Sequence, residues 1–188
     1  MPLLDHFSIL APYYERFIPL NRPGEFFQYL DLPVDGALLD AGGGTGRVSE
    51  VLRGYASQVV LVDLSIGMLK QANLKKGLGV AAARTERLPF TNGTFERVLM
   101  VDALHHVINQ ANTCAELWRV LKKGGKVLIV EPDVRQTWVK LVAVMEKAAL
   151  MRSHFLSPPH ILSLFSFQDA SGQIEIDGYN AWIVIEKH

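Results

Sequence analysis

The chain has 188 residues, enough for one domain and few for two. Apolar residues make up 49% of the sequence and charged residues 20%, as in folded globular proteins rather than disordered or collagen-like ones. Lysine plus arginine and aspartate plus glutamate number 19 each, and no long basic run occurs, so the chain lacks the charge pattern of a dedicated nucleic-acid binder.

The single cysteine, Cys114, excludes an internal disulfide and a zinc site made of cysteines. The apolar runs are too short to cross a bilayer, and no basic segment followed by an apolar stretch marks a secretory signal. We therefore expect a cytoplasmic protein with no membrane span and no nucleic-acid partner, either a monomer or a homodimer.

Strand-like and helix-like segments alternate along the first two thirds of the chain. Two helices, over 7–17 and 24–30, are predicted before any strand. Short apolar runs then predict strands at 37–40, 58–63, 79–83, 95–101 and 125–131, and the segments between them predict helices over 47–54, 65–76 and 112–123. Most of the apolar runs are continuous, which is typical of strands covered by helices on both faces, so the pattern predicts a doubly wound α/β fold with a parallel sheet.

The last third of the chain departs from this alternation. A long apolar helix is predicted over 136–151, a short helix over 160–165, and strands at 173–176 and 181–186. Four residues, 177–180, join the two strands. Because so short a connection cannot hold a crossover helix, the two strands must pair antiparallel.

A glycine loop lies where the first predicted strand meets the following helix, in Asp40-Ala41-Gly42-Gly43-Gly44-Thr45-Gly46-Arg47. Glycines in such a loop allow positive φ angles and a close approach of a ligand to the backbone. The dinucleotide fingerprint requires glycine at its first, third and sixth positions, and the sixth position counted from Gly42 is Arg47. The phosphate-binding loop requires glycine and lysine after a four-residue gap, where Arg47 and Val48 stand. The loop therefore fits neither pattern.

The spacing Asp-Ala-Gly-x-Gly-x-Gly resembles that of the class I S-adenosylmethionine-dependent methyltransferases, in which this loop wraps the methionine end of the cofactor. Asp63, at the end of the second predicted strand, matches the carboxylate that binds the ribose hydroxyls. The segment Asp102-Ala103-Leu104-His105-His106-Val107 resembles a signature of the ubiquinone/menaquinone-biosynthesis type and related type 11 enzymes. With the helix and turn over 116–125, the resemblance covers residues 36–132, about half of the chain.

The resemblance implies a Rossmann-like, three-layer fold whose mostly parallel sheet has an antiparallel C-terminal strand. It implies S-adenosylmethionine as the cofactor and S-adenosylhomocysteine as the product. It also implies a single methyltransferase domain, with a helical lid over 1–35, a cofactor-binding core over 36–132 and acceptor-side helices with the final strand pair over 133–188.

The expected cofactor-binding residues follow from matching the family's motifs to this sequence. They are Asp40, Ala41, Gly42, Gly43, Gly44, Gly46, Asp63, Leu64, Met68, Thr85, Glu86, Asp102 and the lid residue Tyr13. Asp102 is expected to face the cofactor's ammonium group. The expected catalytic residues are His105 and His106, the expected acceptor-binding residues are Tyr14, Glu131, Trp138 and Phe155, and no metal site is expected.

The adenine turn departs from the family pattern. Thr85-Glu86-Arg87-Leu88-Pro89-Phe90 resembles the family's turn, but Arg84 and Thr85 stand where aspartate and alanine are usual. That aspartate commonly accepts the adenine amino group, and an arginine accepts no hydrogen bond. The adenine contact is therefore expected at Thr85 or at backbone atoms.

Several of these residues also have plain structural interpretations. Asp63 could cap the next helix, a task that Ser65 could also perform, and Met68 could belong to the core. The two tyrosines could pack a helix on the sheet, and a histidine of the pair could fix a loop.

The predicted function is methyl transfer to a small, apolar or aromatic acceptor. The alternatives are a non-catalytic cofactor-binding protein of the same fold and a methyltransferase that acts on RNA or protein.

Overall fold

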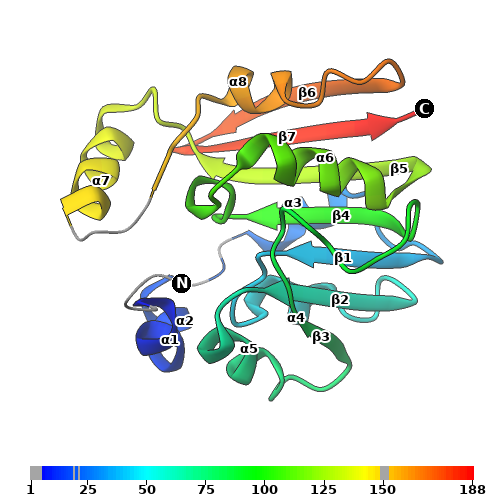
Figure 1. The fold of residues 1–188 in the computed structure, drawn as a ribbon, viewed down its shortest axis with the longest axis horizontal. Coiled ribbons are helices and arrows are strands. Elements are labelled where there is room, and N and C mark those ends of the chain that lie inside the picture. Colours follow the sequence, from blue (N-terminus) through cyan, green and yellow to red (C-terminus); the bar gives the residue numbers. More distant parts are fainter. Residues whose placement is uncertain (1–5, 19, 21, 149–152) are drawn as a thin grey trace.

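The computed structural model describes residues 6–18, 20, 22–148 and 153–188, and its centre is a seven-stranded sheet (Figure 1). The strands are β1 (Ala37–Ala41), β2 (Gln58–Asp63), β3 (Leu78–Ala82), β4 (Phe95–Val101), β5 (Leu121–Pro132), β6 (Ala170–Asp177) and β7 (Asn180–Lys187). The helices are α1 (His6–Leu10), the 3-10 helix η1 (Ala11–Tyr13), α2 (Tyr14–Phe17), α3 (Pro23–Tyr29), α4 (Arg47–Leu52), α5 (Ile66–Ala72), the 3-10 helix η2 (Leu104–His106), α6 (Gln110–Val120), α7 (Thr137–Ala148) and α8 (Pro158–Ser163).

The strand order is β3-β2-β1-β4-β5-β7-β6. β1 to β5 pair parallel to one another, whereas β7 pairs antiparallel with both β5 and β6. This arrangement confirms the predicted doubly wound sheet and the reversal at its C-terminal end.

Two apolar layers sandwich the sheet, because successive side chains of a strand point to opposite faces. Leu39, Val98 and Ile129 pack with α6 and α8 on one face. Their neighbours Leu38, Leu99 and Leu128 pack with α3 and α4 on the other. Burial on both faces explains why these strands read as continuous apolar runs.

The predicted helix over 112–123 is wrong at its end. α6 stops at Val120, and the next residues belong to β5 because the extended, fully buried Leu121 pairs with Phe95 of β4. The predicted helix over 65–76 ends early, at Ala72. The predicted helix over 7–17 is divided into α1, η1 and α2, with Pro12 inside η1, since proline lacks the N–H that a continuous helix needs. Residues 149–151, predicted to end the long helix, lie outside the described residues.

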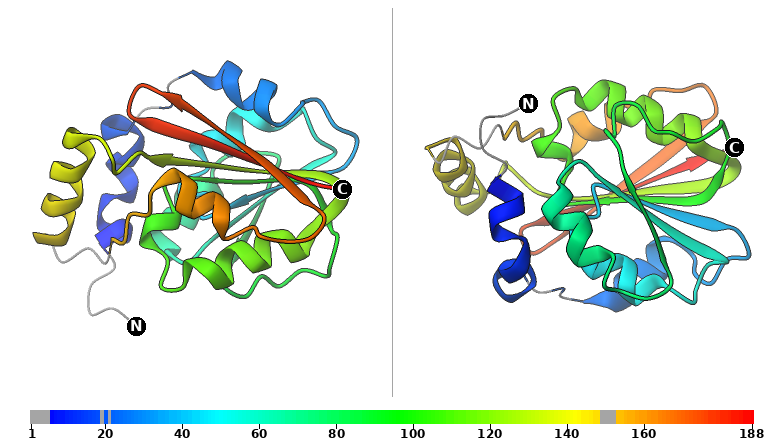
Figure 2. Two further views of the ribbon diagram at one scale, coloured as in Figure 1. Left: turned by 90° about the horizontal axis from the view of Figure 1, so that it is seen from above. Right: turned by 60° about the horizontal axis from the view of Figure 1, so that its bottom comes forward.

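The carboxyl ends of the parallel strands meet at one edge of the sheet, and α1, α2 and α7 lie beyond that edge (Figure 2). The loops after β1, β2, β4 and β5 therefore come together beneath these helices. No helix in the described part of the chain combines the length and apolar character needed to cross a membrane.

The N-terminal segment is docked on the start of α5. The Oγ of Ser8 accepts the N–H of Gly67 at 3.0 Å and lies 3.1 Å from the Oγ of Ser65. A Cβ atom at Gly67 would collide with Ser8, so the close approach of α1 to α5 requires glycine at this position.

Gly67→Ala should push α1 away from α5 while leaving the sheet intact. We expect amide hydrogen exchange of residues 6–18 to become about tenfold faster. The Ser8 contacts are already lost in the variant, so local opening of the segment costs less free energy. Gly24→Ala is the control, since a Cβ atom there meets no atom within 4 Å. Unchanged exchange in the Gly67 variant would contradict this docking.

Candidate functional site

The glycine loop is held against β2. Gly42, Gly44 and Gly46 have φ angles of 73°, 56° and 78°, in the left-handed region that favours glycine. The N–H groups of Gly42 and Gly43 donate to the carbonyl of Val62 at 2.8 and 3.1 Å. The loop therefore has a fixed position at the carboxyl edge of the sheet.

The backbone of one glycine of the loop is less covered than that of its neighbours. A Cβ atom at Gly42 would lie 2.8 Å from Ala103, and one at Gly43 would lie 2.7 Å from Asp40. A Cβ atom at Gly44 would meet only the Sδ of Met68, at 3.9 Å. A ligand can therefore approach the backbone of Gly44 closely.

Asp63 contacts Gly44 from the end of β2. Its Oδ2 accepts the N–H of Gly44 at 2.9 Å and its Oδ1 accepts the N–H of Ser65 at 2.7 Å. The Oγ of Ser65 accepts the N–H of Met68 at 3.5 Å and so caps α5. Asp63 therefore joins the glycine loop to α5, while Leu64 beside it is exposed and Met68 is buried.

Two expected cofactor residues lie beneath the loop rather than at its surface. Ala41 is fully buried, and the side chain of Asp40, 1% exposed, accepts the hydroxyl of Ser49 at 2.6 Å. Burial raises the pKa of Asp40 to about 6, against the opposing effects of the Ser49 hydrogen bond and the charge of Arg47.

The expected adenine-side residues both contact the α6 region. Thr85 is buried, with its Oγ1 3.3 Å from the Oγ1 of Thr113. The Oε1 of Glu86 accepts the N–H groups of Ile108 and Asn109 at 3.1 and 3.4 Å. These side chains hold the adenine turn against the start of α6.

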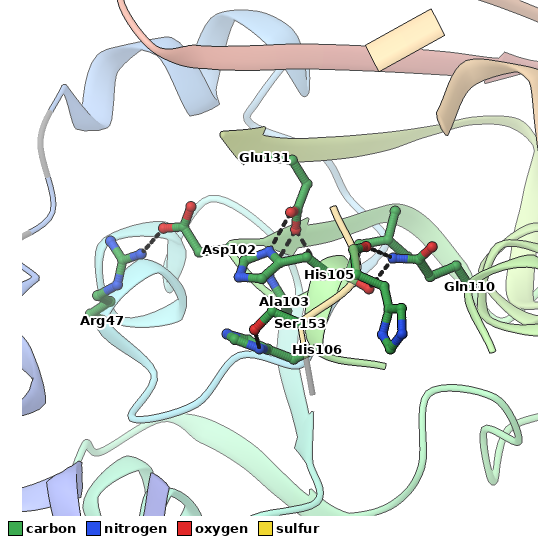
Figure 3. A network of polar contacts seen from close by, with 10 residues as sticks. Arg47, Asp102, Ala103, His105, His106, Gln110, Glu131 and Ser153 are labelled. Atoms are coloured by element: carbon green, nitrogen blue, oxygen red, sulfur yellow. Dashed lines mark hydrogen bonds and ion pairs between the residues drawn. The ribbon is translucent and has the colours of Figure 1, made fainter. Parts of the chain in front are cut away.

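An ion pair that the sequence analysis missed links the glycine loop to the turn after β4. The Nη2 of Arg47 lies 2.7 Å from the Oδ2 of Asp102 (Figure 3), and the two side chains are 10% and 27% exposed. Burial raises the pKa of Asp102, and the neighbouring guanidinium opposes that rise. The sequence did contain a signal for this ion pair: a basic residue directly after the glycines and a carboxylate directly after the neighbouring strand.

Glu131 organises the same turn from the neighbouring strand. Its Oε1 accepts the N–H groups of Ala103 and Leu104 at 2.9 and 2.8 Å, and its Oε2 lies 2.5 Å from the Nδ1 of His105. Both side chains of the Glu131–His105 pair are buried (Figure 3). The structure thus joins an expected acceptor-side residue to an expected catalytic one.

Aromatic side chains surround this pair. The ring of His105 stacks on Phe155 with centroids 4.2 Å apart, and Phe7 lies edge-on to His106 at 5.0 Å. The Nδ1 of His106 lies 3.2 Å from the Oγ of Ser153. Burial, together with the nearby His105, lowers the pKa of His106 to about 3, so its ring is neutral at physiological pH. The described residues include no cluster of three or more His, Cys, Asp or Glu able to hold a metal ion.

The N-terminal segment contacts the glycine loop through Glu15, a residue that the sequence analysis did not single out. The Oγ1 of Thr45 donates to the Oε1 of Glu15 at 2.7 Å, and the Nζ of Lys75 lies 2.6 Å from the same oxygen. Tyr14 is half-buried, whereas Tyr13 and Trp138 have 60% and 66% of their surface exposed. The structure therefore places Glu15, rather than Tyr13, in contact with the loop.

Comparison with known proteins agrees with this geometry. The family described as "Methyltransferase domain" matches residues 39–129, which contain the glycine loop, Asp63 and the turn after β4. Residues 39–129 are therefore similar to a methyltransferase domain. The resemblance identified in the sequence is therefore confirmed.

Related sequences and solved structures point to the same family. The demethylmenaquinone methyltransferase of Thermobifida fusca is 35% identical over 139 residues, which are 69% of this chain and 57% of that protein. The ubiquinone/menaquinone biosynthesis C-methyltransferase UbiE of Stenotrophomonas maltophilia is 32% identical over 114 residues, which are 55% of this chain and 45% of that protein. The chain spans about half the length of the curated relatives it matches. A SAM-dependent methyltransferase of Thermotoga maritima shares the fold, with a TM-score of 0.75, 20% identity and coverage of 97% of this chain and 98% of that one.

The buried carboxyl of Asp40 should make stability fall as the pH rises. Its pKa is about 6 in the native state, against 3.8 for an ordinary aspartate, so the native state retains a proton that the unfolded chain releases between about pH 4 and 6. We expect this group to remove about 2–3 kcal/mol of stability over that interval, and Asp40→Asn to abolish the loss.

Urea unfolding of both proteins at pH 4, 5, 6 and 7 measures the difference, in which the contributions of other groups cancel. Asp35→Asn, at an exposed position, is the matched control. A stability difference between Asp40→Asn and the wild type that does not vary with pH would contradict the raised pKa.

Proposed function

We propose that the chain transfers a methyl group from S-adenosylmethionine to a small, mainly apolar or aromatic acceptor. The observation that carries this proposal is the uncovered backbone of Gly44, which lies at the carboxyl edge of the sheet next to the carboxylate of Asp63. Ligands of open α/β sheets bind at this edge. The methyltransferase family of residues 39–129 supports the same function.

The residues around Gly44 fit the cofactor. A fixed carboxylate such as that of Asp63 accepts hydrogen bonds from both hydroxyls of a ribose. The backbone of Gly44, which no side chain of its own shields, allows the extended chain of the cofactor to approach closely. Asp102 supplies a negative charge for the ammonium group, and the turn at Thr85 and Glu86 offers backbone atoms to the adenine.

The chemistry that the cofactor supplies when bound is a methyl group on positively charged sulfur, which needs an acceptor held in line with it. Of the residues near this edge, His105 is the candidate base. Glu131 accepts the Nδ1–H and thereby selects the tautomer whose basic lone pair is on Nε2. A hydroxyl, or a ring carbon activated by a hydroxyl, would lose its proton to that atom. His106, with its lowered pKa, contributes a neutral polar surface.

The side chains near His105 favour an aromatic acceptor. Phe155, which precedes α8, stacks on the ring of His105, and Phe7 of α1 lies edge-on to the ring of His106. Pockets for such ligands are lined mainly by apolar and aromatic groups. The names of the relatives mention demethylmenaquinone and ubiquinone/menaquinone biosynthesis, so a quinol ring is the first acceptor class to test.

Asp63→Asn should weaken cofactor binding without unfolding the protein. We expect the affinity for S-adenosylhomocysteine to fall about 10- to 100-fold, the loss typical of hydrogen bonds to a charged group. Isothermal titration calorimetry measures it, with Asp169→Asn as an exposed control and NAD as a ligand that should not bind. Equal affinities in the wild type and the Asp63 variant would remove the ribose assignment, and saturable NAD binding would oppose the methyltransferase function.

Methyl-labelled S-adenosylmethionine offered with quinols, phenols, amines and thiols should give a labelled small molecule, with tRNA and protein as control acceptors. On the acceptor found, His105→Gln should lower the turnover number by about 100-fold or more, as expected for loss of a general base. His160→Gln, at an exposed position, is the matched control.

Binding of S-adenosylhomocysteine by the His105 variant should stay within about twofold of the wild type. Labelling of RNA or protein alone would falsify the small-acceptor proposal. Unchanged turnover in His105→Gln would remove the base assignment while leaving methyl transfer intact.

A further inference from the structure

Gln110 lies where α6 meets two other segments of the chain. It is the first residue of α6, and its backbone is fixed by the cap of that helix, in which the Oδ1 of Asn109 accepts the N–H of Asn112 at 2.9 Å. Its Nε2 donates to the carbonyl of Leu104 at 3.0 Å and to the carbonyl of His154 at 2.6 Å (Figure 3). Both hydrogens of the amide are therefore used, one on each segment.

The two segments that Gln110 joins carry the groups proposed to meet the acceptor. Leu104 belongs to η2, and the next residue is His105, the candidate base. His154 lies between α7 and α8, next to Phe155, whose ring stacks on that of His105 with 14° between the ring planes. The N–H of His154 also donates to the carbonyl of His105 at 2.7 Å. Gln110 thus contacts the backbone on both sides of the stacked rings.

The two carbonyl groups require a donor at this place. Both oxygens are directed at one nitrogen atom, so without it their partial negative charges would face the same space. A primary amide suits this position because it carries two N–H donors on one nitrogen atom and no charge. Gln110 therefore holds the segment 153–155 against η2.

The base and the aromatic ring depend on Gln110 to different degrees. The turn that contains η2 is also held by Glu131, which accepts two of its N–H groups and contacts the Nδ1 of His105. The segment 153–155 makes its hydrogen bonds to this turn and to Gln110. Loss of the Gln110 contacts should therefore free Phe155, while His105 keeps its place and its tautomer.

We propose that Gln110 is a positioning residue for the acceptor, because it holds the ring of Phe155 beside the base in the orientation that a flat, aromatic acceptor contacts. The inference rests on the proposed function. It extends that function to a residue outside both segments of the sequence resemblance in this region, 102–107 and 116–125. The contacts of Gln110 would then act on recognition of the acceptor, rather than on the cofactor or on proton transfer.

Gln110→Met keeps the length of the side chain and removes both donors. On the acceptor found by labelling, we expect the KM for the acceptor to rise about tenfold while kcat stays within about threefold, as for the loss of one or two hydrogen bonds that act on binding. The pH profile of kcat should not change, because Glu131 still holds His105. The affinity for S-adenosylhomocysteine should stay within about twofold of the wild type.

Hydrogen exchange reports on the segment without any acceptor. In Gln110→Met, the amides of residues 153–157 should exchange about tenfold faster, because the segment then opens more easily. Gln28→Met is the matched control, at an exposed position of α3 on the opposite face of the sheet, and should change neither the exchange nor the kinetic constants. Gln110→Glu has the shape of glutamine but places a carboxylate before the two carbonyls. It should reproduce the effect and serves if the methionine variant does not fold.

A double-mutant cycle tests whether Gln110 acts through the aromatic ring. Phe155→Ala alone should raise the KM for the acceptor about tenfold or more. Adding Gln110→Met to it should raise the KM by less than about twofold further, because the ring that Gln110 positions is then absent.

A KM in the double variant equal to the product of the two single effects would overturn the inference, because Gln110 would then act independently of Phe155. An active wild type whose KM does not change in Gln110→Met would also overturn it, while leaving the proposed function intact. Wild-type protein that methylates no small acceptor would instead overturn the proposed function, and the inference with it.

Discussion

The site depends on the close contact of the glycine loop with β2 and with the turn after β4. The carbonyl of Val62 accepts hydrogen bonds from the loop and holds it against β2, and the Oδ2 of Asp63 accepts the N–H of Gly44. Ala103 leaves no room for a side chain at Gly42. A larger residue at Gly42 would therefore push the glycine loop away from the turn after β4.

Much of the fold could be predicted from the sequence because the strands are buried on both faces. The predicted strands 58–63 and 95–101 coincide with β2 and β4, since each contains a continuous apolar run, 59–62 or 98–101. The segment 121–123 was mistaken for helix. Its two lysines, followed by Gly124 and Gly125, resemble a helix end. The pairing of Leu121 with Phe95, which is distant in sequence, decides its conformation instead.

The candidate site could be predicted less completely. The sequence indicated Asp63 as a candidate because a residue at the end of a parallel strand lies at the carboxyl edge of the sheet, whichever contacts its side chain makes. Arg47 entered the sequence analysis only as a missing glycine, since its partner Asp102 is 55 residues away and the contact depends on the left-handed turn at Asp102. Likewise, the motif could not show that Asp40 points beneath the loop, toward Ser49.

The docking of the N-terminal segment has a consequence for the binding and release of ligands. Ser8 contacts the start of α5 and Glu15 contacts Thr45 of the glycine loop, so the segment bridges the loop and α5. Exchange of product for fresh cofactor would then include the breaking and remaking of these contacts. Residues that never meet the reacting atoms could in this way set the residence time of the spent cofactor.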